Sequence, residues 1–249
     1  MDGELWILAA VLLITLCASC LQSITGFGFG ILAMIFLPSV IAYTEANDLS
    51  TVLISLTSLC AVAVTFNKVS WKNVVFPVIG CILSTYFAVA FIKTQENETL
   101  KLLLGVALFL LSVYFFFWSG KIKIKPTWYA GLIAGALSGI MGGLFSIGGP
   151  PVVVYFLQSE EDSEHYLGSI SAYFVLSGIV SVASKAIAGF VTERVLLCIA
   201  VGVFGMLLGS FTGKRARDKI NSADMKKAVY GFMAISGKIN IVASAIAII

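Results

Sequence analysis

Eight long apolar stretches, separated by short polar connections, limit what this chain can fold into. They lie at roughly residues 5–42, 49–66, 74–92, 100–118, 127–158, 166–190, 195–213 and 224–247. A helix needs about 20 mainly apolar residues to cross the hydrocarbon core of a bilayer. Six of the stretches have the length of one such helix. The sequence therefore predicts an all-α polytopic membrane protein.

The composition agrees with a membrane protein and argues against a water-soluble fold. Apolar residues make up 59% of the 249 and charged residues only 12%, whereas charged residues account for about 25% of a soluble domain. Because these few polar residues cannot cover an apolar core in water, we expect the protein to be surrounded by the lipid bilayer. The formal charge of +3 comes without a basic patch, and we expect no nucleic-acid partner.

The stretches at 5–42 and 127–158 are too long for one span and too short for two. Each contains a glycine-rich segment, from Thr25 to Gly30 in the first and from Gly142 to Pro151 in the second. Glycine weakens a helix interior, and the two prolines that end the second segment suit the first turn of a new helix. Each stretch is therefore predicted to form a helix, a break and a half-helix.

The two breaks also mark an internal repeat. An offset of 120 residues aligns Gly28 with Gly148 and Leu37 with Leu157. Such self-similarity is typical of a chain built from two homologous halves. We expect a single transmembrane domain over residues 1–249, with repeat 1 at 1–120 and repeat 2 at 121–249. Each half is predicted to hold one glycine-broken segment and three transmembrane helices.

The basic connections distinguish two topologies. They contain Lys68 and Lys72, then Lys121, Lys123 and Lys125, then Lys214, Arg215, Arg217 and Lys219. If each broken segment crosses the membrane fully, the last group lies on the opposite face from the other two. If each is a re-entrant helical hairpin, all three groups lie on the cytoplasmic side, as the positive-inside rule requires. The hairpin topology is favoured, and it makes the two halves inverted repeats.

The breaks are the leading candidates for a binding site. Non-helical backbone at membrane depth is tolerated where it is buried in protein or lines a water-filled cavity. A helix that begins there exposes free N–H groups and roughly half a positive charge, which suits an anion. The alternative is that the glycines only permit close helix packing. The candidate residues at the breaks are Gln22, Ser23, Thr25, Gly26, Gly28, Gly30, Ser146, Gly148, Gly149 and Pro150.

Further candidates lie on the helices. Asn47 and Thr51 belong to a hydroxyl-rich helix that predicts either a wet cavity wall or ordinary hydrogen bonding between helices. Lys238 lies in the last apolar stretch, where a charge costs at least ~2.5–3.5 kcal/mol. It is a candidate anion ligand unless the helix ends early or the side chain reaches the surface. Lys185, nearer the end of its helix, is expected to snorkel to the surface.

Enzymatic motifs are missing from the sequence. It contains no phosphate-binding loop, no His-Glu-x-x-His and no nucleophile elbow, the signatures of common soluble enzymes. The five cysteines all lie in apolar stretches and are expected to act as small hydrophobes. We expect no catalysis, no metal and no cofactor.

The two glycine segments resemble a known family. Thr-Gly-Phe-Gly-Phe-Gly from Thr25, and Gly-Gly-x-x-x-Ile-Gly-Gly-Pro-Pro from Gly142, look like the TauE/SafE family of sulfite and organosulfonate exporters. The resemblance covers essentially the whole chain. It implies a multi-pass carrier in the inner membrane of a bacterium or archaeon. The implied substrate is a small anion such as sulfite, thiosulfate or a sulfonate.

The membrane potential bears on the direction of transport. An anion that leaves an inside-negative cell gains about 2.3 kcal/mol per charge per 100 mV, so export needs no coupled ion. No acidic residue is expected in mid-span to carry a proton, which also favours export. The predicted function is a secondary transporter with a midplane site at the two breaks. The alternative is an anion channel in which the breaks form the constriction. The oligomeric state stays open, with a homodimer as one candidate.

Overall fold

The computed structural model describes residues 2–118, 124–190, 192–216 and 234–244. Within these ranges the chain is helical and contains no strand. Seven of the described helices are long and apolar enough to cross a membrane. The prediction of an all-α, multi-pass membrane protein is confirmed in this part of the chain.

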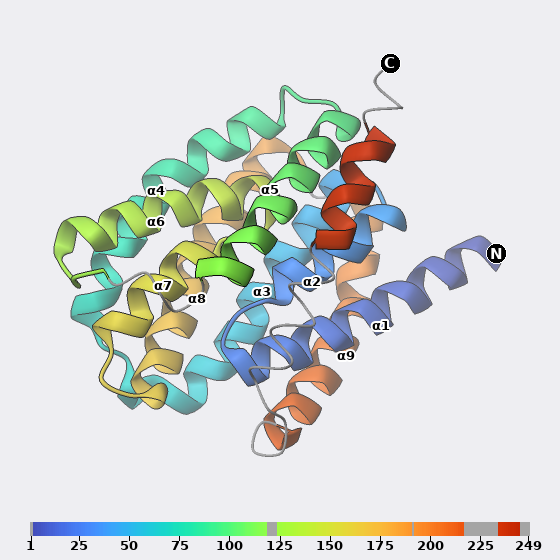
Figure 1. Cartoon of the computed structure of the whole chain (residues 1–249). Coiled ribbons are helices and arrows are strands. Elements are labelled where there is room, and N and C mark those ends of the chain that lie inside the picture. Colours follow the sequence, from blue (N-terminus) through green and yellow to red (C-terminus); the bar gives the residue numbers. More distant parts are fainter. Residues whose placement is uncertain (1, 119–123, 191, 217–233, 245–249) are drawn as a thin grey trace.

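The described helices follow the predicted stretches closely. They are α1 (Asp2–Thr25), α2 (Phe29–Phe36), α3 (Tyr43–Thr65), α4 (Trp71–Ile92), α5 (Asn97–Trp118), α6 (Trp128–Phe145), α7 (Gly149–Ser159), α8 (Ser163–Ala188) and α9 (Glu193–Ala216) (Figure 1). Residues 234–244 form a further helix. The predicted stretch at 224–247 falls largely outside the described residues, as do Lys121, Lys123, Arg217 and Lys219.

Two of the helices are too short to cross a bilayer. Helix α2 has 8 residues and α7 has 11, which at 1.5 Å per residue gives about 12 Å and about 17 Å. The hydrocarbon core is about 30 Å thick. Both short helices follow the predicted glycine segments, so each segment does separate a long helix from a short one.

Helix α3 begins four residues earlier than the hydroxyl-rich helix predicted from Asn47 to Phe66. Its first turn starts at Tyr43, because the Glu45 carboxylate accepts a hydrogen bond from the Ala42 N–H at 3.2 Å and closes the helix start. The polar residues Asn47 and Asp48 therefore lie inside the helix, where both are buried.

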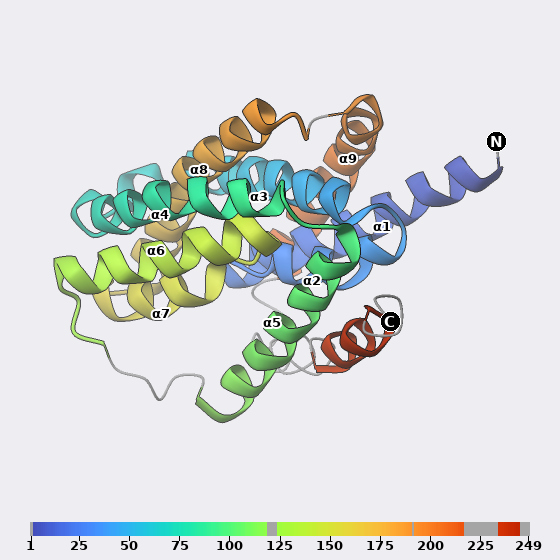
Figure 2. The ribbon, with the colours of Figure 1, turned by 90° about the horizontal axis from the view of Figure 1, so that it is seen from above.

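Three pairs of helices make the main contacts of the bundle. Helix α1 packs along α9, α4 along α6, and α3 along α8 (Figure 2). Each pair joins a helix of the first half of the chain to one of the second. A Cβ atom added at Gly135 would lie 1.9 Å from the Pro77 carbonyl, and one at Gly209 would lie 2.2 Å from the Leu16 carbonyl. These helical glycines therefore allow close packing, as small residues do in membranes.

Large apolar side chains cover the outside of the bundle. Phe87 is 71% exposed, Phe204 67% and Leu83 63%. In water such exposed apolar side chains would mark an interaction site, whereas hydrocarbon solvates them without cost. The polar side chains are instead gathered inside, between the helices.

Candidate functional site

The first break joins α1 to α2 through two glycines in left-handed conformations. Gly26 has φ of 81° and Gly28 of 104°, values that L side chains rarely adopt. A Cβ atom on Gly26 would also lie 2.9 Å from the Leu167 side chain on α8. The Thr25 hydroxyl caps the turn, 2.5 Å from the Phe27 carbonyl. Here glycine is required by the backbone itself and by the neighbouring helix.

The second break reaches a similar conformation with a serine. Ser146 has φ of 55°, the single positive value at a residue other than glycine in the described chain. A backbone of this kind costs of order 1–3 kcal/mol and persists only where its surroundings hold it. The Ser146 hydroxyl lies 2.8 Å from the Asn47 side-chain oxygen, 2.9 Å from the Asn47 carbonyl and 2.8 Å from the Thr51 hydroxyl. These contacts to α3 hold the break.

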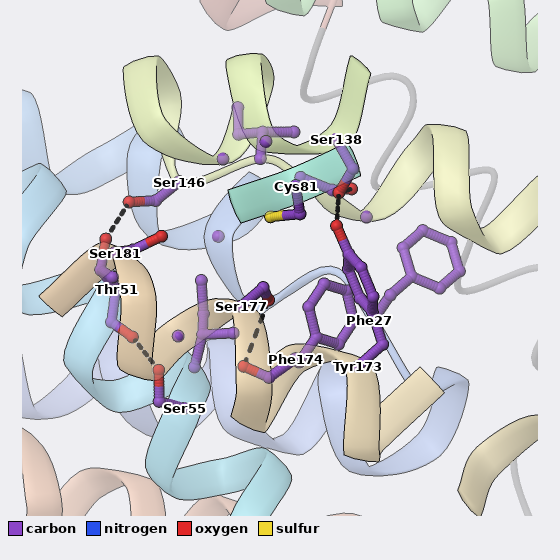
Figure 3. A pocket seen from close by; sticks show the side chains of 18 of the residues that line it. Phe27, Thr51, Ser55, Cys81, Ser138, Ser146, Tyr173, Phe174, Ser177 and Ser181 are labelled. Carbon is purple, nitrogen blue, oxygen red and sulfur yellow. Dashed lines mark hydrogen bonds between the residues drawn. The ribbon is translucent and has the colours of Figure 1, made fainter. Parts of the chain in front are cut away.

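The two breaks meet at one central cavity (Figure 3). A Cβ atom on Gly30, in the first turn of α2, would lie 1.7 Å from the Ser146 carbonyl, so the breaks touch. The cavity volume is about 50 Å³, room for a few waters or one small anion, since each water needs roughly 10–15 Å³. Its lining residues are Gln22, Phe27, Gly28, Gly30, Ile31, Thr51, Ile54, Ser55, Cys81, Thr85, Ser138, Gly139, Gly142, Ser146, Ile147, Gly148, Gly149, Tyr173, Phe174, Ser177, Gly178 and Ser181.

Neutral hydrogen-bonding groups line this cavity. Its described lining contains seven aliphatic hydroxyls, the Tyr173 phenol and the Gln22 amide, but no charged side chain. Helix α2 begins at the cavity, and the N–H groups of its first turn have no partner within the helix. Helix α7 offers fewer, because Pro150 and Pro151 carry no N–H. Six of the seven hydroxyls and the Tyr173 phenol already donate hydrogen bonds within the bundle. The groups left to favour an anion are the N–H groups at the start of α2 and the second amide N–H of Gln22.

A tyrosine and a serine fix the position of α7. The Tyr173 hydroxyl donates to the Ser138 oxygen at 2.7 Å, and Ser138 donates to the Gly148 carbonyl. The first turn of α7 is thereby tied to α6 and α8 at the cavity wall (Figure 3). Ser138 was not among the predicted site residues, because one serine in a glycine-rich helix gives no signal in the sequence.

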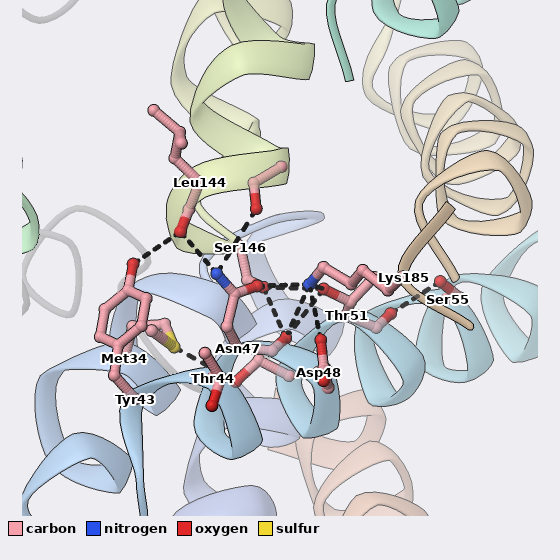
Figure 4. Close-up of polar contacts among 12 residues, drawn as sticks. Met34, Tyr43, Thr44, Asn47, Asp48, Thr51, Ser55, Leu144, Ser146 and Lys185 are labelled. Atoms are coloured by element: carbon pink, nitrogen blue, oxygen red, sulfur yellow. Dashed lines mark hydrogen bonds and ion pairs between the residues drawn. The ribbon is translucent and has the colours of Figure 1, made fainter. Parts of the chain in front are cut away.

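A buried lysine contacts one of the residues that line the cavity, as Figure 4 shows for Lys185 and Thr51. The Lys185 ammonium donates to the Asn47 carbonyl at 3.2 Å, to the Asn47 side-chain oxygen and to the Thr51 hydroxyl at 2.5 Å. The Asp48 carboxylate lies 3.4 Å away. We call Asn47, Asp48, Thr51, Ser146 and Lys185 the lysine cluster.

One expectation about charge was therefore wrong, because Lys185 does not snorkel and is only 2% exposed. Its partner Asp48 lies in the second turn of α3 and is only 4% exposed. Each charge is tolerated because the other neutralises it. The sequence could not show this pairing, which depends on how α3 and α8 lie against each other.

A larger cavity lies on the other side of the first break. Its volume is about 590 Å³, and we call it the vestibule. Gln22 lines both cavities and its amide donates to the Ser58 hydroxyl at 2.9 Å. Lys68 and Lys214 also line the vestibule, and Lys68 pairs with Glu164 at 3.1 Å.

The structure brings most, but not all, of the predicted site residues together. The central cavity is lined by Gln22, Gly28, Gly30, Thr51, Ser146, Gly148 and Gly149. Asn47 contacts Ser146 from behind the wall, while Ser23 and Gly26 line the vestibule. Thr25 is bound within its own turn, and Pro150 lines an apolar groove beside α5. Lys238 is exposed on the helix at 234–244 and lines neither cavity.

Other cavity residues were missed, although a pattern on α8 could have shown some of them. Ser177, Ser181 and Lys185 follow one another at intervals of four residues, which places them on one face of the helix. The hydroxyl-rich face of α3 is both a cavity wall, through Thr51 and Ser55, and a source of hydrogen bonds to other segments, through Ser58 and Thr51.

The comparisons with known proteins agree with this architecture. The family model described as Sulfite exporter TauE/SafE matches residues 11–238. A protein of Cupriavidus necator named "Probable sulfite/organosulfonate exporter TauE" is 21% identical over 223 residues, which cover 85% of each chain. No solved structure matches the chain.

Proposed function

Since this chain belongs to the TauE/SafE sulfite exporter family, we propose that it is a secondary transporter that exports sulfite or a small organosulfonate. The observation that carries the proposal is the meeting of two helix breaks at one cavity that is lined by neutral polar groups and by the start of α2. The similar protein from Cupriavidus necator bears the name of an exporter of the same compounds, which supports the substrate class.

The cavity suits an oxyanion without a base or a metal. Sulfite and sulfonate oxygens accept hydrogen bonds, and the wall supplies the second amide N–H of Gln22 and the first turn of α2. A helix start carries roughly half a positive charge, and transporters with broken helices use such starts to hold anions. The small volume of about 50 Å³ favours sulfite over larger organosulfonates in this state.

The membrane topology that fits best is the re-entrant one, with inverted halves. Lys68, Glu164 and Lys214 line the same vestibule. If each broken segment crossed the membrane, Lys68 would lie on the opposite face from the other two. The 3.1 Å ion pair between Lys68 and Glu164 therefore supports hairpins that return to their own side. The short lengths of α2 and α7 point the same way.

In this topology the protein lies in the inner membrane and its vestibule opens to the cytoplasm. Basic residues mark the cytoplasmic side of short connections, and Lys68 and Lys214 lie at the vestibule. A substrate would enter there, pass Gln22 and bind at the breaks, while the lysine cluster closes the far end. Rocking of one half against the other would then release the anion outside. The inside-negative potential drives this direction without a coupled ion.

The proposal is tested with purified protein in liposomes. Efflux of sulfite, thiosulfate, sulfoacetate and taurine is followed, with chloride as the control anion. We expect saturable efflux of at least one sulfur compound, no chloride flux, and counter-flow of labelled sulfite against unlabelled sulfite. Unitary currents in a planar bilayer would instead identify a channel. No selective flux of any of the four compounds would contradict the proposal.

A further inference from the structure

The ion pair of the lysine cluster is incompletely bonded for a buried pair. The three donors of the Lys185 ammonium have their hydrogen-bond acceptors on Asn47 and Thr51. Asp48 therefore balances the charge from 3.4 Å, and its second carboxylate oxygen is buried without a hydrogen-bond partner. A pair kept only for stability would be expected to satisfy both partners.

The cluster is also adjacent to the cavity. Thr51 and Ser146 both line the cavity, and the Thr51 hydroxyl lies 2.5 Å from the Lys185 ammonium. An anion in the cavity that touches the Thr51 side chain would lie within about 5–6 Å of this positive charge, since polar heavy atoms in contact are about 3 Å apart. Ser181, four residues before Lys185 on α8, lines the same wall.

The fold itself does not require the cluster. With the repeat offset of 120 residues, Asn47 in the first half corresponds to Leu167 in the second, and Lys185 in the second half corresponds to Thr65 in the first. The first break packs against Leu167 where the second bonds to Asn47. One half of the chain thus builds the same break with no buried charge. The charged residues are an addition at the second break, next to the cavity.

We propose that Lys185 determines the selectivity of the carrier for anions and that Asp48 limits its attraction so that the anion can leave again. The proposal rests on the function proposed above. Lys185 supplies a full positive charge where the lining has only neutral donors. Asp48 offsets part of that charge, because a carrier must bind its substrate firmly enough to load it and weakly enough to release it.

The test compares three variants in the liposome efflux assay, with sulfite, sulfoacetate and taurine as substrates. Lys185→Gln removes the positive charge and Asp48→Asn the negative one, and both keep the polar side chains. The double variant Lys185→Gln with Asp48→Asn removes both and leaves no unpaired buried charge. Lys93→Gln, at an exposed lysine after α4, is the matched control.

The two single variants are expected to shift KM in opposite directions. Asp48→Asn lowers both KM and kcat for sulfite, because the anion binds more tightly and leaves more slowly. Lys185→Gln raises KM for sulfite and sulfoacetate by more than about tenfold, the effect of one charge at this distance in a medium of effective dielectric near 20. Taurine, a zwitterion without net charge, is affected less. Lys93→Gln leaves all three KM values unchanged.

The double variant guards against loss of folding. It is expected to keep a thermal stability close to that of the unsubstituted chain, yet to show a raised KM for sulfite. The inference is overturned if it exports sulfite with an unchanged KM, or if the single variants lower kcat equally for all three substrates. If the unsubstituted chain exports none of these compounds, the proposed function fails first and the inference falls with it.

Discussion

The two ends of the α3–α8 pair carry the same kind of ion pair in opposite surroundings. At the vestibule end, Lys68 and Glu164 lie 3.1 Å apart with side chains 46% and 69% exposed. At the other end, Lys185 and Asp48 lie 3.4 Å apart and are 3% and 5% exposed. Among the described residues, the vestibule of about 590 Å³ thus lies at the exposed pair and the lysine cluster at the buried pair, with the central cavity between them. Under the proposed function this is the form of a carrier with one side open.

The two breaks differ in a parallel way. The first reaches its left-handed turns with Gly26 and Gly28 and needs no side chain. The second uses Ser146, whose hydroxyl bonds to Asn47 and Thr51. One break is held by the freedom of its backbone and the other by a polar network. Substitutions at the two breaks should therefore impair the protein for different reasons.

The largest difference in unfolding free energy is expected between variants that remove one partner from the buried ion pair and from the exposed one. Lys185→Gln leaves the Asp48 charge buried and alone, which costs about 3–5 kcal/mol of unfolding free energy. Glu164→Gln at the exposed pair should cost about 0–1 kcal/mol. Denaturant unfolding in detergent measures both. Equal losses at the two ends would show that the burial difference has no energetic consequence.

Exchanging the side chains at the breaks should have a smaller effect. Gly26→Ala places a Cβ in a left-handed turn and 2.9 Å from Leu167, and we expect a loss of about 1–2 kcal/mol. Ser146→Gly relieves the backbone while losing the hydroxyl contacts, so its stability should change less and its sulfite efflux more. Unfolding and efflux are measured on the same preparations. If Gly26→Ala and Ser146→Gly lose the same stability and both keep full sulfite efflux, the two breaks do not differ in the way described.

Removing the hydrogen bond that fixes α7 against α6 and α8 should lower stability by a still smaller amount. Tyr173→Phe removes the 2.7 Å hydrogen bond to Ser138, worth about 0.5–1.5 kcal/mol. Ser138 still donates to the Gly148 carbonyl, so the break should keep its shape. A modest fall in melting temperature with sulfite efflux reduced severalfold is expected. A loss as large as that of Lys185→Gln would place the main support of the second break here instead.

The smallest effect on stability is expected from acid, at Asp162 before the start of α8. Asp162 caps α8 by accepting from the N–H groups of His165 and Glu164, and these bonds lower the pKa of its carboxyl below the usual value. A lowered pKa stabilises the fold above the usual pKa of aspartate, about 3.9, and this stabilisation is lost as the pH falls through the lower folded value. Asp162→Asn should reduce the acid-induced fall in melting temperature. An identical fall would rule out the cap as its source.

The sequence predicted the helices and the breaks because both leave local signals. Apolar runs of span length gave the bundle, and the glycines at 26 and 28 lie at positive φ where only glycine fits well. Asp48 left no such signal, and the spacing of Lys185 from Ser177 and Ser181 shows a polar face of α8 without showing which helix that face contacts. The start of α3 was misplaced for a related reason, because polar residues in a first turn look like a connection. Tertiary contacts decided what local patterns could not.

The most direct test of the account is sulfite efflux by a Gly142→Val variant. Gly142 lines the cavity, and a Cβ there would meet nothing closer than the Gly148 Cα at 3.5 Å. The Cβ of valine fits there in ordinary contact, and its two methyl groups extend into the space between the breaks. Gly189→Asn is the control, at an exposed left-handed glycine with no neighbour within 4 Å. The account predicts that Gly142→Val folds as stably as the unsubstituted chain and loses most sulfite efflux, while Gly189→Asn keeps it. Undiminished efflux by a folded Gly142→Val protein would contradict the placement of the anion site between the breaks.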